Sequence, residues 1–433
     1  MRVDTGDCVE KDWTAIYSEL IRRLPGLAAS APITFCGSGA CVDARVAMRD
    51  VISASRQGTP DARRFADFLQ DRAARGQGGE VTYDWPGGPD WLGRNVSASY
   101  AIGGTGPHAA WTLSVLGAPT LLALEDRSEL MLQFTPADVF LASDGRLVRA
   151  AEAKPVGAAR RPVFNFEYTA GVPLGSVVPD RSSRVIVKFG HFGLERDPDF
   201  DELTAARAGG AGAGSVSGFT SVARDDLRGE VARIAAQAGT WREGGLETVH
   251  LELGSFDTAD MAQTVVDGLR GMVTSVGMSL SELIALAPGN LDMGLAMREF
   301  ANTLQVERVC IHADSWAASL TRWDPDVELD ALLTGCLLAA SRAAVGVPVM
   351  PLDLDPAAIF ETLPSATVGE NGDWRFVGCA SPFLRAPRTT LGLGDTFTSG
   401  CLLALGAASR GKGACEPLPS GVERRIFQPP TKR

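Results

Sequence analysis

Hydrophobic residues near the beginning of the chain recur at the spacing of one face of a helix. They are Trp13, Ile16, Tyr17, Leu20, Ile21 and Leu24. Pro25 and Gly26 follow directly, so the pattern predicts a helix that ends there. A polar helix is predicted over 60–75, and an Ala/Leu-rich helix over 330–345 is predicted to end at Gly346.

Short apolar runs bounded by glycine, proline or polar residues predict strands. They lie at 33–36, 81–83, 121–124, 139–141, 162–168, 184–189, 248–253 and 309–312. From residue 248 onward the predicted strands alternate with helices, which indicates a parallel sheet with helices on both faces. A Gly/Ala-rich stretch over 205–218 is predicted to be a flexible connection or a surface loop.

The chain has 433 residues, which is long for one ordinary domain and predicts two. Hydrophobic residues make up 45% and charged residues 21% of the sequence, the usual proportions of a globular enzyme. The net charge of −11 argues against binding to nucleic acid or to a membrane surface, because both are anionic. We expect a monomer or a small homo-oligomer.

Cysteine usage and the terminal sequence predict a cytoplasmic location. None of the eight cysteines forms a Cys-x-x-Cys pair, and several lie in apolar segments, which suggests buried thiols in a reducing compartment. Residues 1–13 are charged and contain no apolar signal core. No uninterrupted apolar run is long enough to span a membrane.

A glycine-rich stretch, 390–397, precedes an apolar run near the C-terminal end. It predicts a glycine turn that opens a helix, whose first N–H groups carry partial positive charge and bind anions. Gly392 and Gly394 have no Cβ, so a phosphate can approach their backbone closely. Asp395 could then take a proton from a hydroxyl that attacks phosphorus. The alternative is an ordinary helix with Asp395 as its N-cap.

Acidic residues elsewhere are further candidates. His250 and Glu252 share one face of a predicted strand, because alternate side chains do. They either hold a hydrated metal ion through water or form a satisfied polar pair under a loop. Glu282 follows Ser279 by three positions, which also fits a helix capping box. Asp43 could accept hydrogen bonds from two sugar hydroxyls, or could be a turn residue.

In their order along the chain, these segments resemble the ribokinase-like superfamily, and within it the ADP-dependent glucokinase and phosphofructokinase family. The superfamily's Gly-x-Gly-Asp is matched at 392–395, and the family's next residue by Thr396. The family's His-x-Glu motif is matched at 250–252. Its Ser-x-Gly-Met-Asn-Glu-x-Glu-Leu segment is matched by Ser275, Gly277, Met278, Glu282 and Leu283, and further matches are Gly103-Gly104, 166–168 and 216–219.

The resemblance implies a role for each matched residue. Asp395 is similar to the base that deprotonates the acceptor hydroxyl, and Gly392, Leu393 and Gly394 resemble the anion hole for the transferring phosphoryl group. Glu282 and Glu252 resemble the acidic groups that place Mg²⁺ through water. The implied architecture is a large α/β ribokinase-like domain, with a mostly parallel central sheet flanked by helices, and a smaller β-rich lid. The expected ranges are 1–44, 101–145 and 205–433 for the large domain, and 45–100 and 146–204 for the lid.

The resemblance also implies the ligand contacts. Arg184 is similar to an arginine that contacts the nucleotide phosphate. Asp43 resembles the acceptor of sugar hydroxyls, with Gly103 and Gly104 lining the same pocket. Glu80 resembles a glutamate of the glucose-using members, and two carboxylates would repel a phosphorylated acceptor.

Two departures from the family pattern affect the expected function. Ser279 stands where the family has Asn, and Leu280 replaces an acidic residue, so metal handling is expected to differ. Thr105 and His108 are also unusual after the paired glycines. The main expectation is an ADP-dependent kinase of a neutral sugar such as glucose. The alternatives are an ATP- or ADP-dependent kinase of fructose 6-phosphate, a nucleoside or a specialised metabolite, and a catalytically weak sugar-binding pseudokinase.

Overall fold

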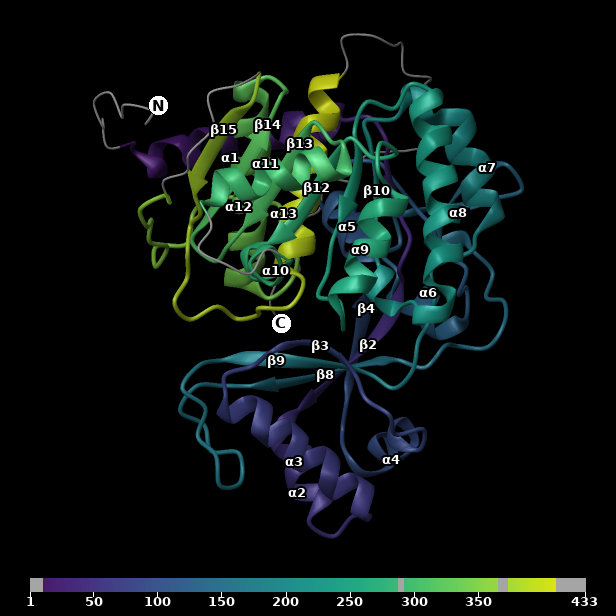
Figure 1. Ribbon diagram of the computed structural model, residues 1–433, viewed down its shortest axis with the longest axis vertical. Helices are drawn as coiled ribbons and strands as arrows, with labels where there is room; N and C mark the ends of the chain where they lie inside the picture. Colours follow the sequence, from purple (N-terminus) through teal and green to yellow (C-terminus); the bar gives the residue numbers. More distant parts are fainter. Residues whose placement is uncertain (1–10, 287–291, 365–372, 410–433) are drawn as a thin grey trace, which may run out of the picture.

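The computed structural model describes residues 11–286, 292–364 and 373–409. The protein has a large unit built on a ten-stranded sheet and a small unit built on a five-stranded sheet. In Figure 1 the large unit occupies the upper part of the view and the small unit lies below it. The predicted α/β fold with a smaller second unit is therefore confirmed.

The large sheet is parallel through its centre and antiparallel at both edges. In spatial order its strands are β15 (Arg375–Ala380), β14 (Trp316–Thr321), β13 (Arg308–His312), β12 (Ser275–Ser279), β11 (Val249–Glu252), β10 (Ala213–Val216), β1 (Thr34–Cys36), β5 (Thr120–Leu122), β6 (Phe140–Ser143) and β7 (Arg146–Arg149). The prediction of a parallel sheet after residue 248 was wrong for its last two strands, β14 and β15. A short turn between β13 and β14 reverses the chain, and β15 then pairs antiparallel with β14.

Helices cover both faces of the large sheet, and the interior strands are short apolar runs because both faces are buried. On one face the helices are α7 (Pro198–Arg207), α8 (Arg224–Glu243), α9 (Ala259–Gly268) and α11 (Met293–Leu304). On the other they are α1 (Trp13–Ser30), α5 (Thr105–Val115), α12 (Pro325–Val345) and α13 (Leu393–Ala408). Two short helices, α6 (Glu129–Phe134) and α10 (Leu280–Leu286), follow β5 and β12. None of these described helices is long and apolar enough to cross a membrane.

The first helix is longer than its sequence predicts. Pro25 lies inside α1, which continues to Ser30. Tyr17, Leu20, Leu24 and Ala28 are buried along one face, whereas Pro25 is exposed. Burial of the apolar face offsets a cost of about 3 kcal/mol for proline in a helix.

The Gly/Ala-rich stretch over 205–218 is not a loop throughout, so that prediction was wrong. Residues 213–216 form β10, a fully buried strand in the middle of the large sheet. Gly214 has no side chain because a Cβ there would lie 2.8 Å from the ring of Trp241. Small residues in this strand reflect close packing of α8 on the sheet rather than flexibility.

The small unit has one apolar and one polar sheet face. Its strands, in order, are β3 (Gly79–Thr82), β9 (Ser183–Lys188), β8 (Val163–Tyr168), β2 (Cys41–Ala47) and β4 (Ser99–Gly103). The apolar face packs against α2 (Met48–Ser55), α3 (Pro60–Ala74) and α4 (Gly88–Asn95). The strand registers place the charged and amide side chains on the opposite face, which we call the polar face of the small sheet: Asp43, Arg45, Glu80, Asn165, Glu167, Arg184 and Lys188.

The two sheets divide the chain near the predicted lid borders but not at them. Strand β2 crosses the border at 44/45, and β4 crosses the one at 100/101. Strand β7 and the first part of helix α7 fall in the predicted lid range, yet β7 belongs to the large sheet and α7 packs in its core. Hydrogen bonding between strands, which decides sheet membership, is not visible in local composition.

Candidate active site

The glycine stretch forms the predicted turn and opens α13. Gly392 is the N-cap residue and has a φ of 68°, a left-handed conformation that favours glycine. Its Cβ, if present, would lie 2.6 Å from Nη2 of Arg342, so glycine is also needed for space. The amide of Thr396 donates to the Gly392 carbonyl at 3.0 Å and begins the helix. The preceding amides of the first turn have no partner within the helix and are available to an anion.

Asp395 lies in the first turn of α13 and does not act as its N-cap. Burial raises its pKa, and the nearby charge of Glu252 adds to this. A hydrogen bond from Thr105 and the charges of Arg342 and Arg184 act in the opposite direction. The carboxylate thus lies at a helix start, under the influence of two cations, a suitable place for a general base beside a transferring phosphoryl group.

Arg342, in the last turn of α12, is a site residue that the sequence did not single out. It is fully buried and donates from Nη1 to Oγ1 of Thr396 at 2.9 Å. Its Nη2 lies 3.3 Å from Nδ1 of His108, and its guanidinium lies 5.5 Å from the ring centre of Trp111. Burial lowers the pKa of Arg342 to about 10. A lone arginine within the predicted Ala/Leu-rich helix was the available signal.

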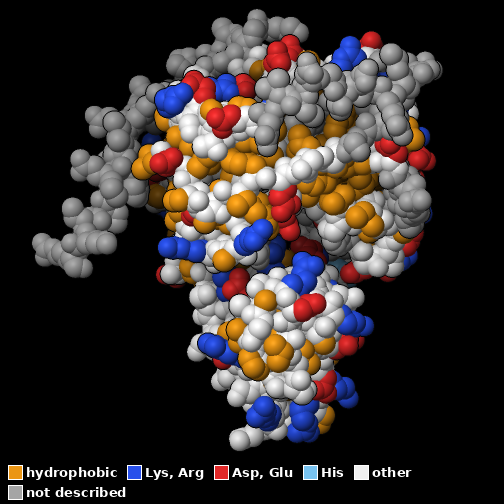
Figure 2. Space-filling view, turned by 90° about the vertical axis from the view of Figure 1, so that its left-hand side faces the viewer, with side chains coloured by type: hydrophobic (Ala, Val, Ile, Leu, Met, Phe, Trp, Pro, Cys, Tyr) orange, Lys and Arg blue, Asp and Glu red, His pale blue; other side chains and the backbone are white. Residues whose placement is uncertain are grey.

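Arg184 brings the polar face of the small sheet to the glycine turn. Its Nη1 donates to Oγ1 of Thr390 at 3.0 Å, two residues before Gly392. Burial lowers the pKa of Arg184, whereas Asp395 raises it. Figure 2 shows basic and acidic side chains gathered where the two units meet.

Asp43 and the paired glycines lie together, as the resemblance implied. Asp43 is a buried residue of β2 rather than a turn residue. A Cβ on Gly103 would lie 2.5 Å from Cγ of Asp43, so glycine at that position makes room for the carboxyl group. Burial raises the pKa of Asp43 to about 7, and the charge of Arg45 opposes this. Gly104, with a φ of 94°, caps α5.

Glu80 is paired rather than free. Nζ of Lys188 lies 2.9 Å from its Oε2 and also donates to the Thr220 carbonyl at 2.7 Å. The hydroxyl of Thr220 donates to the same carboxylate oxygen at 2.9 Å. Burial alone would raise the pKa of Glu80, but the ion pair and these hydrogen bonds leave it below its usual value. Lys188 therefore neutralises one of the two carboxylates that the sequence placed in the sugar pocket.

His250 and Glu252 form a direct pair on β11. Nε2 of His250 lies 3.0 Å from Oε2 of Glu252, and the hydroxyl of Thr398 in α13 donates to the same oxygen at 3.0 Å. Nε2 of His312 lies 3.6 Å from Oε1. Burial would raise the pKa of Glu252, but the two histidines hold it near 2.

His312 was also missed by the sequence interpretation. It ends β13, and a Cβ on Gly394 would lie 3.1 Å from its ring. The signal was its place at the carboxyl end of a strand beside parallel neighbours, where α/β proteins bind ligands.

The second metal candidate, Glu282, makes the predicted capping box. The amide of Ser279 donates to its Oε2 at 2.8 Å, and the Glu282 amide donates to Oγ of Ser279 at 3.3 Å. Burial raises the pKa of Glu282 to about 7, and repulsion by Glu252 contributes. A hydrated divalent cation near both carboxylates would relieve that repulsion, so the pair fits Mg²⁺ held through water. Among the described residues no three His, Cys, Asp or Glu side chains are arranged to ligate a metal directly.

Comparison with known proteins identifies the family. The conserved region of ADP-specific phosphofructokinases and glucokinases matches residues 33–404. The chain belongs to this family. The ADP-dependent glucose/glucosamine kinase of Pyrococcus abyssi is 23% identical over 220 residues, which are 44% of this chain and 48% of that protein. That match therefore spans about half of the relative's length.

Solved structures of the family share the fold. An ADP-dependent kinase in complex with fructose-6-phosphate and ADPβS has a TM-score of 0.73 at 16% identity, over 94% of this chain and all of that one (100%). A hypothetical ADP-dependent phosphofructokinase from Pyrococcus horikoshii has a TM-score of 0.69 at 16% identity, over 88% and 99%. The resemblance inferred from the sequence motifs is confirmed at the level of family and fold.

Proposed function

We propose that this family member is an ADP-dependent sugar kinase that transfers the terminal phosphoryl group of ADP to a hydroxyl of a neutral sugar such as glucose, giving a sugar phosphate and AMP. The observation that favours a neutral sugar as the acceptor is the Lys188–Glu80 ion pair. Lys188 is engaged by Glu80 and by the Thr220 carbonyl, so it is not free for a second phosphate. Asp43 adds an acceptor for hydroxyl groups. The Pyrococcus abyssi relative is a glucose/glucosamine kinase, which agrees with this choice.

In the proposed reaction Asp395 accepts the proton of the attacking sugar hydroxyl. Its raised pKa strengthens it as a base while Arg342 and Arg184 keep it ionised. Asp43 accepts hydrogen bonds from other hydroxyls and orients the sugar. Gly103 leaves room for the Asp43 carboxyl group.

Charge on the transferring phosphoryl group is stabilised by fixed donors. These are the amides at the start of α13, which follow Gly392, and the Arg184 and Arg342 guanidinium groups. When bound, Mg²⁺ would neutralise phosphate charge, with Glu252 and Glu282 holding its water shell. Thr398, His250 and His312 keep Glu252 ionised.

A phosphorylated acceptor such as fructose 6-phosphate is the second candidate, because one part of the polar face has unused donors. Arg45 and Asn165 are register partners on β2 and β8. Nε of Arg45 and both polar atoms of the Asn165 amide are buried and make no hydrogen bond of regular geometry within the described residues. A sugar phosphate group placed there could accept from Nε of Arg45 and Nδ2 of Asn165, and a sugar hydroxyl could donate to Oδ1 of Asn165. The relative solved with fructose-6-phosphate belongs to the same family.

The test is a matrix of acceptors and donors. Glucose, glucosamine and fructose 6-phosphate are each offered with ADP and with ATP in Mg²⁺ buffer, and AMP or ADP formation is followed. We expect AMP formation with ADP, and kcat/KM at least tenfold higher for glucose or glucosamine than for fructose 6-phosphate.

Other outcomes separate the alternatives. A preference for fructose 6-phosphate would reject the neutral acceptor and support the Arg45–Asn165 interpretation. ATP as the better donor would reject the proposed donor. Sugar binding by calorimetry without turnover would support a binding protein.

A further inference from the structure

A row of buried polar side chains crosses three neighbouring parallel strands below the site. His250 of β11, Ser275 of β12 and Arg308 of β13 are direct register partners, so they lie side by side on one face of the sheet. Nδ1 of His250 lies 2.8 Å from Oγ of Ser275, and Nη1 of Arg308 donates to that oxygen at 3.1 Å. Nε of Arg308 donates to both carboxylate oxygens of Glu328 in α12, each at 2.9 Å. The Arg308 and Glu328 side chains are 1% and 0% exposed.

The chemistry of these groups gives the row a direction. Arginine can only donate, so the Ser275 oxygen accepts a hydrogen bond from Arg308. The Ser275 hydroxyl can then donate its own hydrogen bond to Nδ1 of His250. Nδ1 then accepts, and the ring proton resides on Nε2, where it donates to Glu252. The opposite tautomer would turn a lone pair of Nε2 toward the carboxylate.

The strand next to the pair leaves room for this contact. Gly277 of β12 is the register partner of Glu252. A Cβ on Gly277 would overlap Oε2 of Glu252 and lie 2.8 Å from Nε2 of His250. Glycine at this position therefore allows the His250–Glu252 hydrogen bond to form.

We propose that Glu328, Arg308, Ser275 and His250 form a buried relay that orients the carboxylate of Glu252 toward the magnesium site. Its members are positioning residues that reach neither substrate nor metal. Outer-shell partners of this kind hold a metal-binding carboxylate in one orientation, and losing one costs roughly 10- to 100-fold in metal affinity or activity. The inference rests on the proposed role of Glu252 at the metal.

The main test compares two serine variants that lie in the same sheet, Ser275 on β12 and Ser319 on β14, with β13 between them. Ser275→Ala breaks the relay between Arg308 and His250. Ser319→Ala is the matched control, because Ser319 is 0% exposed and its hydroxyl has no partner within the described residues. We expect Ser275→Ala to raise the Mg²⁺ concentration for half-maximal rate roughly tenfold or more. The control should leave that concentration unchanged, and the sugar KM at saturating Mg²⁺ should change little in both.

A second variant keeps every polar group of the relay. Gly277→Ala should separate His250 from Glu252 and raise the Mg²⁺ requirement in the same way. If both Ser275→Ala and Gly277→Ala lower the unfolding temperature but leave the Mg²⁺ titration at the level of Ser319→Ala, the relay is structural only and the proposal is wrong.

Two readouts need no turnover, so they separate failure of the relay from failure of the proposed kinase activity. Mn²⁺ affinity by electron paramagnetic resonance should weaken in Ser275→Ala and not in Ser319→Ala; equal affinities would overturn the proposal. In ¹⁵N-labelled wild-type protein, His250 should carry its proton on Nε2 with Nδ1 unprotonated. Detection of the Nδ1–H tautomer would contradict the relay. Both readouts could give the expected result while the wild-type protein phosphorylates no sugar. In that case only the proposed reaction is rejected, and the relay stands.

Discussion

At the scale of single residues, the ionisation of the site's buried carboxylates depends on nearby cations. Asp395 is pushed toward the protonated form by burial and held ionised by Arg342 and Arg184. Glu80 and Lys188 neutralise each other. Because each group is tuned by a partner far away in the chain, single substitutions should have specific effects on the reaction rather than a general loss of fold.

Asp395→Asn keeps the shape of the side chain and removes the base. We expect kcat to fall by roughly two to four decades, the usual loss for a general base. Affinity for ADP, measured by calorimetry, should change little because the helix amides and both arginines remain. Turnover at the wild-type level in a coupled assay would show that Asp395 is not the base.

Glu80→Ala removes an acceptor for sugar hydroxyls and frees Lys188. The KM for a neutral sugar should rise roughly tenfold, about the worth of one hydrogen bond to a charged group. Activity with fructose 6-phosphate should increase, because Lys188 could then meet its phosphate. The double variant Glu80→Ala/Lys188→Met is the control and should lose that increase. An unchanged ratio of kcat/KM values for the two acceptors would contradict this view of Glu80.

The pH dependence should report Asp43, whose pKa burial raises to about 7. Below that pH the carboxyl group is protonated and accepts sugar hydroxyls poorly, so kcat/KM for the sugar should fall as pH decreases through about 7. The assay uses saturating Mg²⁺, which keeps Glu282 ionised, so that protonation of Glu282 does not contribute to the pH profile. Asp43→Asn should lower kcat/KM at pH 8 and flatten the acidic limb of the profile. A limb that is unchanged in this variant would belong to another group.

At the scale of elements, close packing explains where composition misled the prediction. The Gly/Ala-rich composition around β10 predicts a flexible segment, yet the strand lies between β1 and β11 under Trp241 of α8. Helices α12 and α13 also meet through glycines: a Cβ on Gly400 would lie 2.7 Å from Cα of Gly335. This close approach holds α13, and with it the glycine turn, against the sheet.

Gly214→Ala tests the packing of β10. The added methyl group would press on the Trp241 ring, so the free energy of unfolding should fall by about 1–3 kcal/mol, the usual cost of overpacking a core. Urea denaturation measures this change. Gly229→Ala is the control, since Gly229 is exposed in α8 with nothing within 4 Å of its Cβ position. It should be neutral or stabilise by up to about 1 kcal/mol, and equal effects of both variants would contradict the packing argument.

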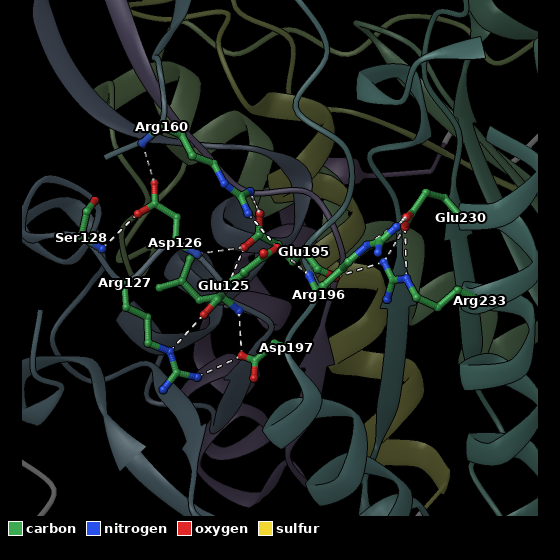
Figure 3. Close-up of polar contacts among 11 residues, drawn as sticks. Glu125, Asp126, Arg127, Ser128, Arg160, Glu195, Arg196, Asp197, Glu230 and Arg233 are labelled. Atoms are coloured by element: carbon green, nitrogen blue, oxygen red, sulfur yellow. Dashed lines mark hydrogen bonds and ion pairs between the residues drawn. The ribbon is translucent and has the colours of Figure 1, made fainter. Parts of the chain in front are cut away.

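At the scale of the whole molecule, an ion-pair network holds segments that run between the two units (Figure 3). Glu195, which follows β9, accepts from the amides of Glu125 and Asp126 at 2.6 and 3.4 Å and pairs with Arg160, which precedes β8. Its own amide donates to the Ser38 carbonyl at 2.6 Å, just before β2. Three of the segments that lead into or out of the small sheet therefore meet at one buried residue, Glu195.

Arg160→Met should weaken this junction, because it leaves the Glu195 carboxylate buried without its cation. We expect a loss of about 1–3 kcal/mol in the free energy of unfolding by urea. Arg196→Met is the matched control, because Arg196 pairs with Glu230 but its side chain is 68% exposed, compared with 25% for Arg160. Exposed pairs contribute about 0–1 kcal/mol. Equal losses in both variants would show that the junction is no stronger than a surface pair.

From residue types and their spacing we could predict the family, about half of the described strands and the local geometry of two motifs. The glycine turn at 392–394 and the capping box of Ser279 and Glu282 are built from neighbours in the chain, so their residue types and spacing are sufficient to predict them. The pairing of His250 with Glu252 follows in the same way from alternation along one strand.

Which distant groups complete the site could be seen only once the chain was folded. Arg342 and His312 reach the glycine turn from α12 and β13, and Lys188 neutralises Glu80 across β9 and β3. The relay from Glu328 to Glu252 depends on the register of three parallel strands. Such contacts are set by packing and strand order, which join residues far apart in the chain, whereas sequence patterns record only the conformation of each segment and the face that it buries.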